Sequence, residues 1–282
     1  MAKLTYGLIG HPVAHSLSPA MQNAAFDALK IDAEYKLFDV EPSGLEDFLK
    51  NMAKNGIAGA NVTIPHKIKA KDFIKTNGLL NEHAERLGAV NTIKVVGDKL
   101  TGFNTDGPGF YRSLVEDLKF EPEGKSIFVL GAGGAAHAIV MYLGNGPKEI
   151  FVTDIDDCMV AELKKRFEKH YDHRRFKAVP GNKFKESLDA SDLLIQATPI
   201  GMRDGDPSPV DPDLLHPGLR VYDLVYNRPA TKLVEMANKK KLHATTGLGM
   251  LLFQGAIAFE LWTVKKAPVE VMKKALKETL KS

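Results

Sequence analysis

Strand-like and helix-like patterns of apolar residues alternate along the N-terminal third of the chain. Within Asn61–Ile64 polar and apolar residues alternate one by one, as in a strand with one buried face. The predicted strands are Leu4–Gly10, Ala33–Val40, Ala58–Ile64, Ala89–Val96 and Lys99–Asn104. The predicted helices are Pro19–Leu29, Ser43–Asn55 and shorter pieces within His66–Arg86. Such an alternation over a long stretch is typical of an α/β sheet.

A second alternating series begins near Asp106, with a predicted helix over Gly107–Leu118. Its strands are short, continuous apolar runs, which are typical of strands buried in a parallel sheet. These predicted strands are Lys125–Leu130, Glu149–Asp154, Asp192–Thr198 and Leu219–Tyr226. Arg203–Gly218 is rich in turn residues and is predicted to be a long surface loop. From Leu248 the chain is predicted to be helical to its end, with a break at Pro268.

The two series predict two α/β domains with a cleft between them. The first domain comprises residues 1–104, and the second comprises residues 105–247. Residues 248–282 are expected to return to the first domain, because their helices need an apolar surface to pack against. A length of 282 residues fits two ordinary domains.

Composition narrows the class of protein. The chain is 44% hydrophobic and 26% charged, which is typical of a globular protein with a sizeable core. A net charge of +3 does not indicate a nucleic-acid partner. The single cysteine, Cys158, excludes an intramolecular disulfide and fits a reducing compartment. Because no signal peptide or long apolar run is present, we expect a cytoplasmic protein without a membrane partner. The histidines show no metal-ligand spacing, so we expect no metal.

A glycine-rich segment, VLGAGGAA at Val129–Ala136, lies between a predicted strand and a predicted helix. It satisfies the G-x-G-x-x-G/A pattern of dinucleotide-binding loops. The first glycine permits a tight turn, the second lets the backbone approach a pyrophosphate, and the last small residue allows close helix–strand packing. The alternative is a glycine-rich turn in a domain that binds no dinucleotide. The predicted cofactor-binding residues of this loop are Gly131, Ala132, Gly133, Gly134 and Ala135.

Asp154 ends the next predicted strand, close to the spacing of about 20 residues at which an acidic residue binds the ribose. A carboxylate there accepts hydrogen bonds from ribose hydroxyls and repels a 2′-phosphate. Asp156 or Asp157 is expected to cap the following helix. The stretch TDIDDC contains no arginine, and Arg174 and Arg175 are predicted to be surface residues. The sequence therefore predicts NAD rather than NADP as the cofactor.

Polar residues also gather at predicted strand ends and helix starts outside this loop. Each has an ordinary explanation taken alone: Ser18 and Asp106 as helix caps, Lys67 as a surface lysine. Their occurrence together suggests a binding site at the ends of the strands. The residues concerned are Ser16, Ser18, Asn61, Thr63, Lys67, Asn91, Asn104, Asp106 and Gln254.

Read together and in order, these segments resemble the shikimate dehydrogenase family, and the match covers nearly the whole chain. Seven ordered motifs are far more specific than a glycine-rich loop alone. They are GxxxxHSLSPxMxN at Gly10–Asn23, NVTIPHK, GAVNT, GxNTDGxGF, GAGGAA, ATPIGM and GLGMLLFQGAIAFELW. The resemblance implies that residues 1–104 with 248–282 bind the substrate and that residues 105–247 form a Rossmann-type dinucleotide-binding domain.

The resemblance also implies an activity, namely the reversible reduction of 3-dehydroshikimate to shikimate with a nicotinamide cofactor. Lys67 and Asp106 match the catalytic positions. Lys67 would stabilise and protonate the carbonyl oxygen, although a water molecule remains an alternative proton donor. The substrate-binding positions are Ser16, Ser18, Thr63, Lys67, Asn91, Asp106, Tyr226 and Gln254. Further positions expected to line the dinucleotide are Thr198, Leu224, Gly247 and Met250.

Three departures from the family pattern stand out. Gln196 replaces the common asparagine before the ATPIGM motif, and Arg228 stands where proline is usual. The stretch TDIDD replaces an asparagine–arginine motif for the 2′-phosphate, which favours the NAD-using quinate/shikimate branch. Preference for shikimate or quinate stays open, as does a monomeric or homodimeric state. The alternatives are a dehydrogenase of another small hydroxy acid and a non-catalytic sensor, which the presence of both Lys67 and Asp106 disfavours.

Overall fold

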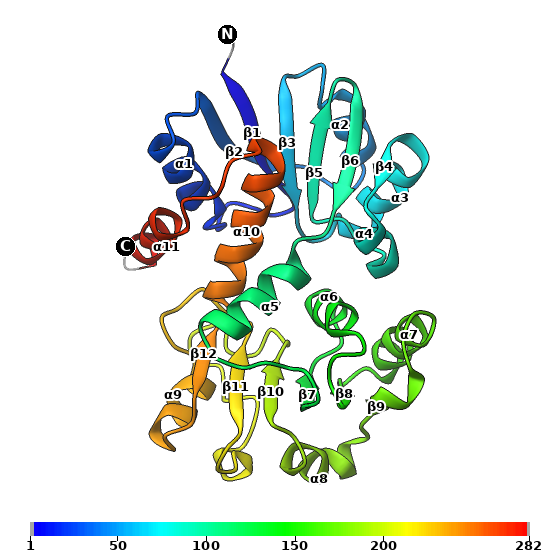
Figure 1. Cartoon of the computed structure of the whole chain (residues 1–282), viewed down its shortest axis with the longest axis vertical. Helices are drawn as coiled ribbons and strands as arrows, with labels where there is room; N and C mark the ends of the chain where they lie inside the picture. Colours follow the sequence, from blue (N-terminus) through cyan, green and yellow to red (C-terminus); the bar gives the residue numbers. More distant parts are fainter. Residues whose placement is uncertain (1–2, 281–282) are drawn as a thin grey trace. The chain divides into compact units, whose positions relative to one another are not determined.

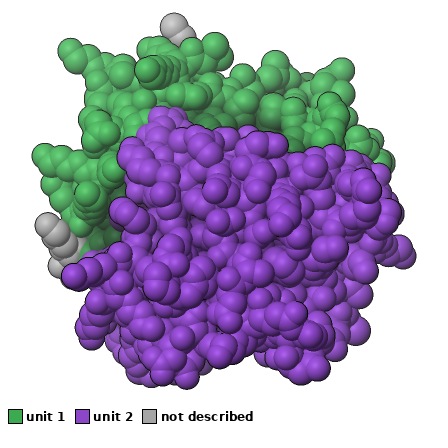
Figure 2. All heavy atoms as spheres, turned by 60° about the horizontal axis from the view of Figure 1, so that its bottom comes forward, with its two compact units in different colours: residues 1–106, 252–282 green, residues 107–251 purple. Residues whose placement is uncertain are grey.

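The computed structural model describes residues 3–280 and contains two compact units (Figure 2). Within the described residues, unit 1 runs to Asp106 and resumes at Leu252, and unit 2 is Gly107–Leu251. The chain leaves unit 1 at the first residue of α5 (Asp106–Glu116) and returns within α10 (Leu248–Thr263). Each unit contains one six-stranded sheet with helices, which confirms the predicted α/β class (Figure 1).

The sheet of unit 1 has the strand order β2-β1-β3-β5-β6-β4. Its strands are β1 (Leu4–Gly10), β2 (Ala33–Asp39), β3 (Ile57–Val62), β4 (Leu79–Leu80), β5 (Thr92–Val96) and β6 (Lys99–Phe103). Strands β1, β2 and β3 are parallel, whereas β5 is antiparallel to both β3 and β6. Consequently the carboxyl ends of β1, β2, β3 and β6 lie at the same edge as the amino end of β5.

Helices cover both faces of this sheet (Figure 1). On one face lie α1 (Ser18–Ala28), α10 and α11 (Val269–Thr279), and α11 packs along α1. Trp262 of α10 stacks on Tyr6 of β1 at a centroid distance of 5.1 Å and donates its indole N–H to the Ile93 carbonyl at 2.9 Å. The predicted return of the C-terminal helices to the first domain is therefore confirmed.

The opposite face carries α2 (Leu45–Asn51), α3 (Lys67–Asn77) and α4 (Glu82–Leu87). Leu49 of α2 and Ile74 of α3 are buried in one apolar cluster with Val62 and Ile93 of the sheet. Since α3 directly follows β3, this packing fixes the position of its first residue, Lys67, at the sheet edge.

Unit 2 contains an all-parallel sheet with the order β12-β11-β10-β7-β8-β9. Its strands are β7 (Ser126–Leu130), β8 (Glu149–Thr153), β9 (Phe176–Ala178), β10 (Leu193–Gln196), β11 (Arg220–Asp223) and β12 (Ala244–Thr246). Counted from β7, this is the 6-5-4-1-2-3 order of doubly wound dinucleotide-binding sheets. In such sheets ligands bind beyond the carboxyl ends of the strands at the point where the strand order reverses, which here lies between the neighbouring strands β7 and β10.

Most helices of unit 2 lie between successive strands along the chain, while α5 precedes the first strand and α10 follows the last. The helices are the part of α5 from Gly107 onward, α6 (Gly134–Leu143), α7 (Asp157–Glu168), α8 (Phe184–Asp189), α9 (Lys232–Lys239) and the start of α10. Phe128, Leu194 and Val221 of the sheet are buried in one cluster with Leu233 of α9. No helix formed by residues 3–280 combines the length and apolarity needed to cross a bilayer.

Two local predictions are wrong. Residues 66–86 contain the short strand β4 as well as helices; a two-residue strand is too short to give a periodic signal. Arg203–Gly218 is not a surface loop throughout, because Val210 and Leu215 are buried against β10 and β11 in the apolar cluster of unit 2. A short 3₁₀ turn at Pro212–Leu214 brings Leu215 inward.

Candidate active site

Lys67 and Asp106 form an ion pair at the edge of the unit 1 sheet. The Lys67 ammonium lies 2.6 Å from Oδ2 of Asp106, and the two side chains are 28% and 11% exposed. Lys67 is the first residue of α3 and Asp106 the first residue of α5. The neighbouring His66 is fully buried, and its Nε2 donates to the Val40 carbonyl at 2.6 Å, which ties the start of α3 to the end of β2.

Asn91 fixes the other oxygen of Asp106. Its Nδ2 donates to Oδ1 of Asp106 at 2.8 Å and to the Thr105 hydroxyl at 3.0 Å. Its Oδ1 accepts from the Thr105 backbone N–H at 2.7 Å. Both Asp106 oxygens are thus oriented by a donor, and each keeps a lone pair for a hydroxyl of a ligand.

Ser16 and Ser18 lie at the start of α1. The Ser18 backbone N–H donates to the Ser16 hydroxyl at 3.2 Å, and Ser18 is 5% exposed. Ser18 is the first helical residue and the cap position belongs to Leu17, so the ordinary interpretation of Ser18 as a helix cap is wrong. Ser18 instead lies close enough to the phenol of Tyr35 to lower its pKa, against the larger effect of burial, which raises it; Tyr35 is a buried residue of β2 that the sequence did not single out.

Thr63 and Gln254 occupy separate elements of unit 1. Thr63 follows the last residue of β3, and its methyl group lies against Gly10, where a Cβ would come within 2.4 Å. Gln254 lies on α10 and is largely buried. The next carbonyl of that helix, of Gly255, accepts from the amide of fully buried Gln22 at 2.9 Å, which holds this turn of α10 against α1.

In unit 2 the glycine-rich loop has the geometry of a phosphate cradle. Gly131 has φ = +106°, and a Cβ there would lie 2.9 Å from the Ala197 backbone. A Cβ at Gly133 or Gly134 would meet no atom within 4 Å. Gly133 also leaves the first turn of α6 without a side-chain cap. Open space in front of free backbone N–H groups at a helix N-terminus fits a pyrophosphate.

The other residues predicted to line the cofactor follow neighbouring strands. Thr198 comes after β10, Leu224 after β11, Gly247 after β12, and Met250 lies in the first turn of α10. A Cβ on Gly247 would lie 2.2 Å from the Leu224 carbonyl oxygen, so only glycine fits there. Parallel strands bring these ends and the glycine-rich loop to the same edge of the sheet.

Asp154 holds the glycine-rich loop directly. Its Oδ2 accepts from the Ala132 N–H at 2.6 Å, and its Oδ1 accepts from the Asp156 N–H at 3.0 Å. Asp156 caps α7 through the Cys158 N–H at 2.9 Å, which confirms one of the two predicted caps. The intervening Ile155 is fully exposed.

The two departures near the strand ends have defined roles in unit 2. Gln196 is fully buried; its Nε2 donates to the carbonyls of Thr198 and Ile200 at 3.1 and 2.8 Å, and its Oε1 accepts from the Thr198 N–H at 2.7 Å. Arg228 donates to the Met202 carbonyl at 2.9 Å. The segment that carries Tyr226, which is 38% exposed, is thereby tied to the ATPIGM loop.

Sequence reasoning also missed Asp223, the last residue of β11. It is fully buried, accepts from the Thr231 hydroxyl at 2.7 Å and from the Val225 N–H at 3.1 Å, and so holds the segment containing Leu224 and Tyr226. Burial raises the pKa of the Asp223 carboxyl to about 6, against these two hydrogen bonds, which lower it. Its position within an apolar strand gave no sequence signal.

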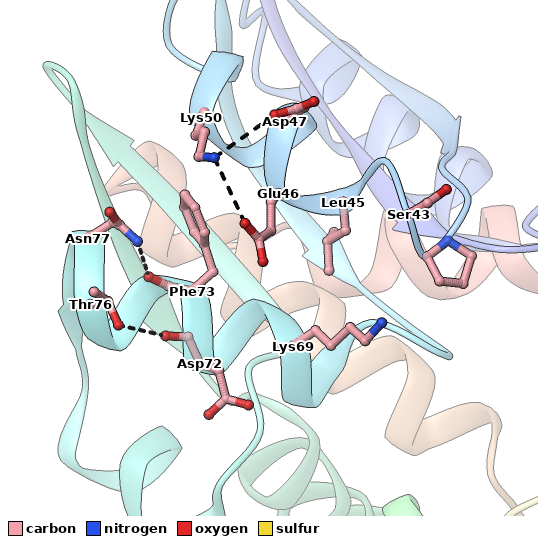
Figure 3. A pocket seen from close by; sticks show the side chains of 11 residues that line it. Ser43, Leu45, Glu46, Asp47, Lys50, Lys69, Asp72, Phe73, Thr76 and Asn77 are labelled. Carbon is pink, nitrogen blue, oxygen red and sulfur yellow. Dashed lines mark hydrogen bonds and ion pairs between the residues drawn. The ribbon is translucent and has the colours of Figure 1, made fainter.

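A surface pocket lies elsewhere on unit 1, between α2 and α3 (Figure 3). It is lined by residues such as Glu46, Asp47, Lys50 and Phe73, and by none of the predicted site residues. Lys50 lies 3.8 Å from Glu46 and 3.9 Å from Asp47, so its charge is already paired. Within residues 3–280 no group of three or more histidine, cysteine or acidic side chains is placed to hold a metal ion.

Comparison with known proteins agrees with this geometry. The family model described as the shikimate dehydrogenase substrate binding domain matches residues 8–93, and that of the shikimate 5′-dehydrogenase C-terminal domain matches residues 247–277. A shikimate dehydrogenase (NADP(+)) of Methanopyrus kandleri is 45% identical over 282 residues, which is 98% of this chain and 95% of that protein. The chain belongs to the shikimate dehydrogenase family.

Solved structures of this family superimpose on the whole chain. A shikimate dehydrogenase in complex with NADP+ is 38% identical, with a TM-score of 0.90 and coverage of 99% of this chain and 96% of that one. The Listeria monocytogenes shikimate 5-dehydrogenase, solved with shikimate and NAD, is 34% identical, with a TM-score of 0.87 and coverage of 97% and 96%. A quinate dehydrogenase from Corynebacterium glutamicum in complex with NAD is 26% identical, with a TM-score of 0.90 and coverage of 98% and 99%.

Replacing Asp223 with asparagine should change how stability depends on pH. The pKa of Asp223 in the folded protein, about 6, lies above the ordinary value of 3.8, so the unfolded chain releases this proton first as pH rises. Relative to Asp223→Asn, the wild-type free energy of unfolding should fall between about pH 4 and pH 6 and then level off, by on the order of 3 kcal/mol in total. Denaturant unfolding across pH measures it; a difference that does not vary with pH contradicts the account.

Proposed function

We propose that this protein interconverts shikimate and 3-dehydroshikimate with a nicotinamide dinucleotide. The observation that carries the proposal is the Lys67–Asp106 ion pair, which Asn91 holds in one orientation at the edge where the strands of unit 1 end. A cation beside a carboxylate suits a reaction in which charge develops on a substrate oxygen. Membership of the shikimate dehydrogenase family supports the choice of substrate.

Each side chain has a defined task in this reaction. A bound nicotinamide supplies the hydride for reduction and accepts it in oxidation. In reduction, the Lys67 ammonium stabilises the negative charge on the carbonyl oxygen and donates its proton there; in oxidation, the neutral amine takes the hydroxyl proton. Asp106 orients Lys67 and accepts a hydrogen bond from a neighbouring substrate hydroxyl. The hydroxyls of Ser16 and Ser18 bind the substrate carboxylate.

The remaining predicted residues complete the two binding functions. Unit 1 would bind the substrate, with Thr63, Asn91 and Gln254 contacting ring oxygens. Unit 2 would bind the dinucleotide beyond the ends of β7, β10, β11 and β12, which is supported by its strand order and by the open glycine-rich loop. Tyr226 would add a third donor to the substrate carboxylate.

The cofactor we propose is NAD, although the Methanopyrus kandleri relative is named for NADP(+). Three carboxylates, Asp154, Asp156 and Asp157, flank the exposed Ile155 in the sequence after β8, where a 2′-phosphate would have to bind. Arg174 is paired with Asp172 at 2.9 Å, and Arg175 donates to the Pro147 carbonyl. A 2′-phosphate would therefore meet like charge without an available arginine from these positions.

Turnover can be tested by following the absorbance of the reduced nicotinamide with shikimate or quinate as substrate and NAD or NADP as cofactor. We expect shikimate to be oxidised, with a higher kcat/KM for NAD than for NADP. Quinate is included because an NAD-complexed quinate dehydrogenase shares the fold and because the acidic stretch after β8 fits that branch. Binding of both ligands without turnover would favour a sensor, and absence of activity and of binding with either acid would contradict the proposed function.

The substitution Ile155→Arg should move the cofactor preference toward NADP. One charge-assisted hydrogen bond to a 2′-phosphate, of roughly 1.5 kcal/mol, corresponds to a rise of about 10-fold in kcat/KM for NADP. Val96→Arg adds the same charge at an exposed apolar residue of unit 1 and should leave both cofactors unaffected. Equal kcat/KM for NAD and NADP in the wild type would overturn the NAD assignment.

The substitution Lys67→Ala should lower kcat for shikimate oxidation by about 10²–10⁴-fold, because general acid–base assistance is lost. The KM for NAD should change little, since Lys67 belongs to unit 1. Lys69→Ala provides the matched control, because Lys69 lies on the same helix and is exposed. Near-normal turnover by Lys67→Ala would remove Lys67 from the mechanism.

A further inference from the structure

A continuous chain of side-chain hydrogen bonds crosses unit 1 from Tyr35 to Lys67. It begins at the Tyr35 phenol, whose pKa is raised by burial and lowered to a smaller extent by the nearby Ser18 side chain. The Tyr35 hydroxyl donates to Asn61 Oδ1 at 2.8 Å, and Asn61 Nδ2 donates to the Thr92 hydroxyl at 3.0 Å. The Thr92 hydroxyl lies 2.9 Å from Asn91 Oδ1, and Asn91 Nδ2 donates to Asp106 Oδ1 at 2.8 Å. The Lys67 ammonium donates to Asp106 Oδ2 at 2.6 Å. The chain therefore joins Tyr35, which lies beside the serine that would bind the carboxylate, to the catalytic pair.

Two backbone groups fix the orientation of both asparagine amides in this chain. Asn61 Nδ2 also faces the Asn91 carbonyl at 3.3 Å, which only accepts, so Asn61 Oδ1 must face Tyr35, and Tyr35 donates to it. The Thr105 N–H donates to Asn91 Oδ1, so the Asn91 amide donors must face Asp106. The Thr92 hydroxyl accepts from Asn61 and lies 2.9 Å from Asn91 Oδ1 and 3.2 Å from the Thr105 hydroxyl. Tyr35 and both amides therefore donate in the direction of Asp106.

The members from Tyr35 to Asn91 are shielded from water. Tyr35, Asn61, Thr92 and Asn91 are between 0% and 4% exposed, so a member that loses its partner cannot replace it with solvent. Burial raises the pKa of the Tyr35 phenol more than the Ser18 side chain lowers it. Tyr35 therefore stays protonated and remains a donor to Asn61 over the neutral pH range.

We propose that Tyr35 is a positioning residue for catalysis, acting through Asn61, Thr92 and Asn91 on Asp106. Its side chain extends from β2 across β1 to Asn61 on β3, the strand that leads to Lys67. When a substrate carboxylate binds Ser18, the Tyr35 hydroxyl still donates to Asn61, so the catalytic end keeps its orientation. This role rests on the proposed function, because it assigns Ser18 to the substrate carboxylate.

Two near-isosteric substitutions test the role: Tyr35→Phe and Thr92→Val each delete one hydroxyl of the chain. Each should lower kcat with shikimate by about 10-fold or more, since small displacements of a catalytic group are costly. Because the two hydroxyls act in series, the double variant should be little worse than the poorer single variant, whereas independent sites multiply. The KM for NAD and the thermal midpoint report whether a variant is merely unfolded, and calorimetry reports shikimate binding separately from turnover.

Tyr6→Phe is the matched control. Tyr6 lies opposite Tyr35 in the β1–β2 register, and its ring stacks on Phe26 and Trp262, but its hydroxyl takes no part in the chain. It should change kcat by less than about 2-fold and should combine multiplicatively with Thr92→Val. Equal effects of Tyr35→Phe and Tyr6→Phe, or multiplying effects of Tyr35→Phe and Thr92→Val, would overturn the proposal.

The outcomes also separate this role from the proposed function. A wild-type protein that turns over shikimate while Tyr35→Phe behaves like Tyr6→Phe removes only the positioning role. A wild-type protein that neither binds nor oxidises shikimate removes the proposed function and the positioning role together.

Discussion

The ion pair between Lys67 and Asp106 is the contact around which the candidate active site of unit 1 is arranged. A partly buried charge pair needs further hydrogen bonds to offset the cost of its desolvation. Asn91 supplies one to Asp106, and the packing of α3 through buried His66 holds Lys67 in place. The direction of the strands brings the two residues together, because Lys67 follows β3 and Asp106 follows β6 at the same edge of the sheet.

Unit 2 presents mainly backbone groups, rather than charged side chains, at the ends of its strands. Its strand ends are linked by backbone hydrogen bonds, such as Leu224 N–H to the Gln196 carbonyl at 2.9 Å. Buried polar side chains then fix the loops beyond the strands: Gln196 holds the turn at Thr198, and Asp223 holds the segment after β11. A dinucleotide binding there would meet an already ordered surface, which lowers the entropic cost of binding.

The sequence predicted those parts of the site that carry local signals. Lys67 stands directly after a strand and a proline, and the glycine-rich loop has its own spacing pattern; both lie where expected in the fold. Most strands were found because their apolar patterns are regular, whereas the short strands β4 and β12 were missed. The prediction of a surface loop was wrong for the second half of Arg203–Gly218, because the many turn residues gave no sign that Val210 and Leu215 are buried.

What the sequence did not reveal depends on which strands are neighbours. Tyr35 was predicted to lie in a strand, but its link to Asn61 exists only because β2 and β3 flank β1. Asp223 likewise depends on Thr231, which lies beyond the next loop, and Gln22 depends on Gly255, which is far away in the chain. From the sequence alone such residues are assigned to ordinary core positions, because the role of a buried polar side chain can be inferred only once its hydrogen-bond partners are known.

A crystal structure of the protein with bound shikimate would show whether Lys67 and Asp106 contact the substrate. We expect substrate hydroxyl oxygens within about 3.2 Å of both the Lys67 ammonium and an Asp106 carboxylate oxygen, while Asn91 keeps its hydrogen bond to Asp106. Shikimate bound in unit 1 with neither Lys67 nor Asp106 in contact with it would rule out the catalytic role proposed for this pair.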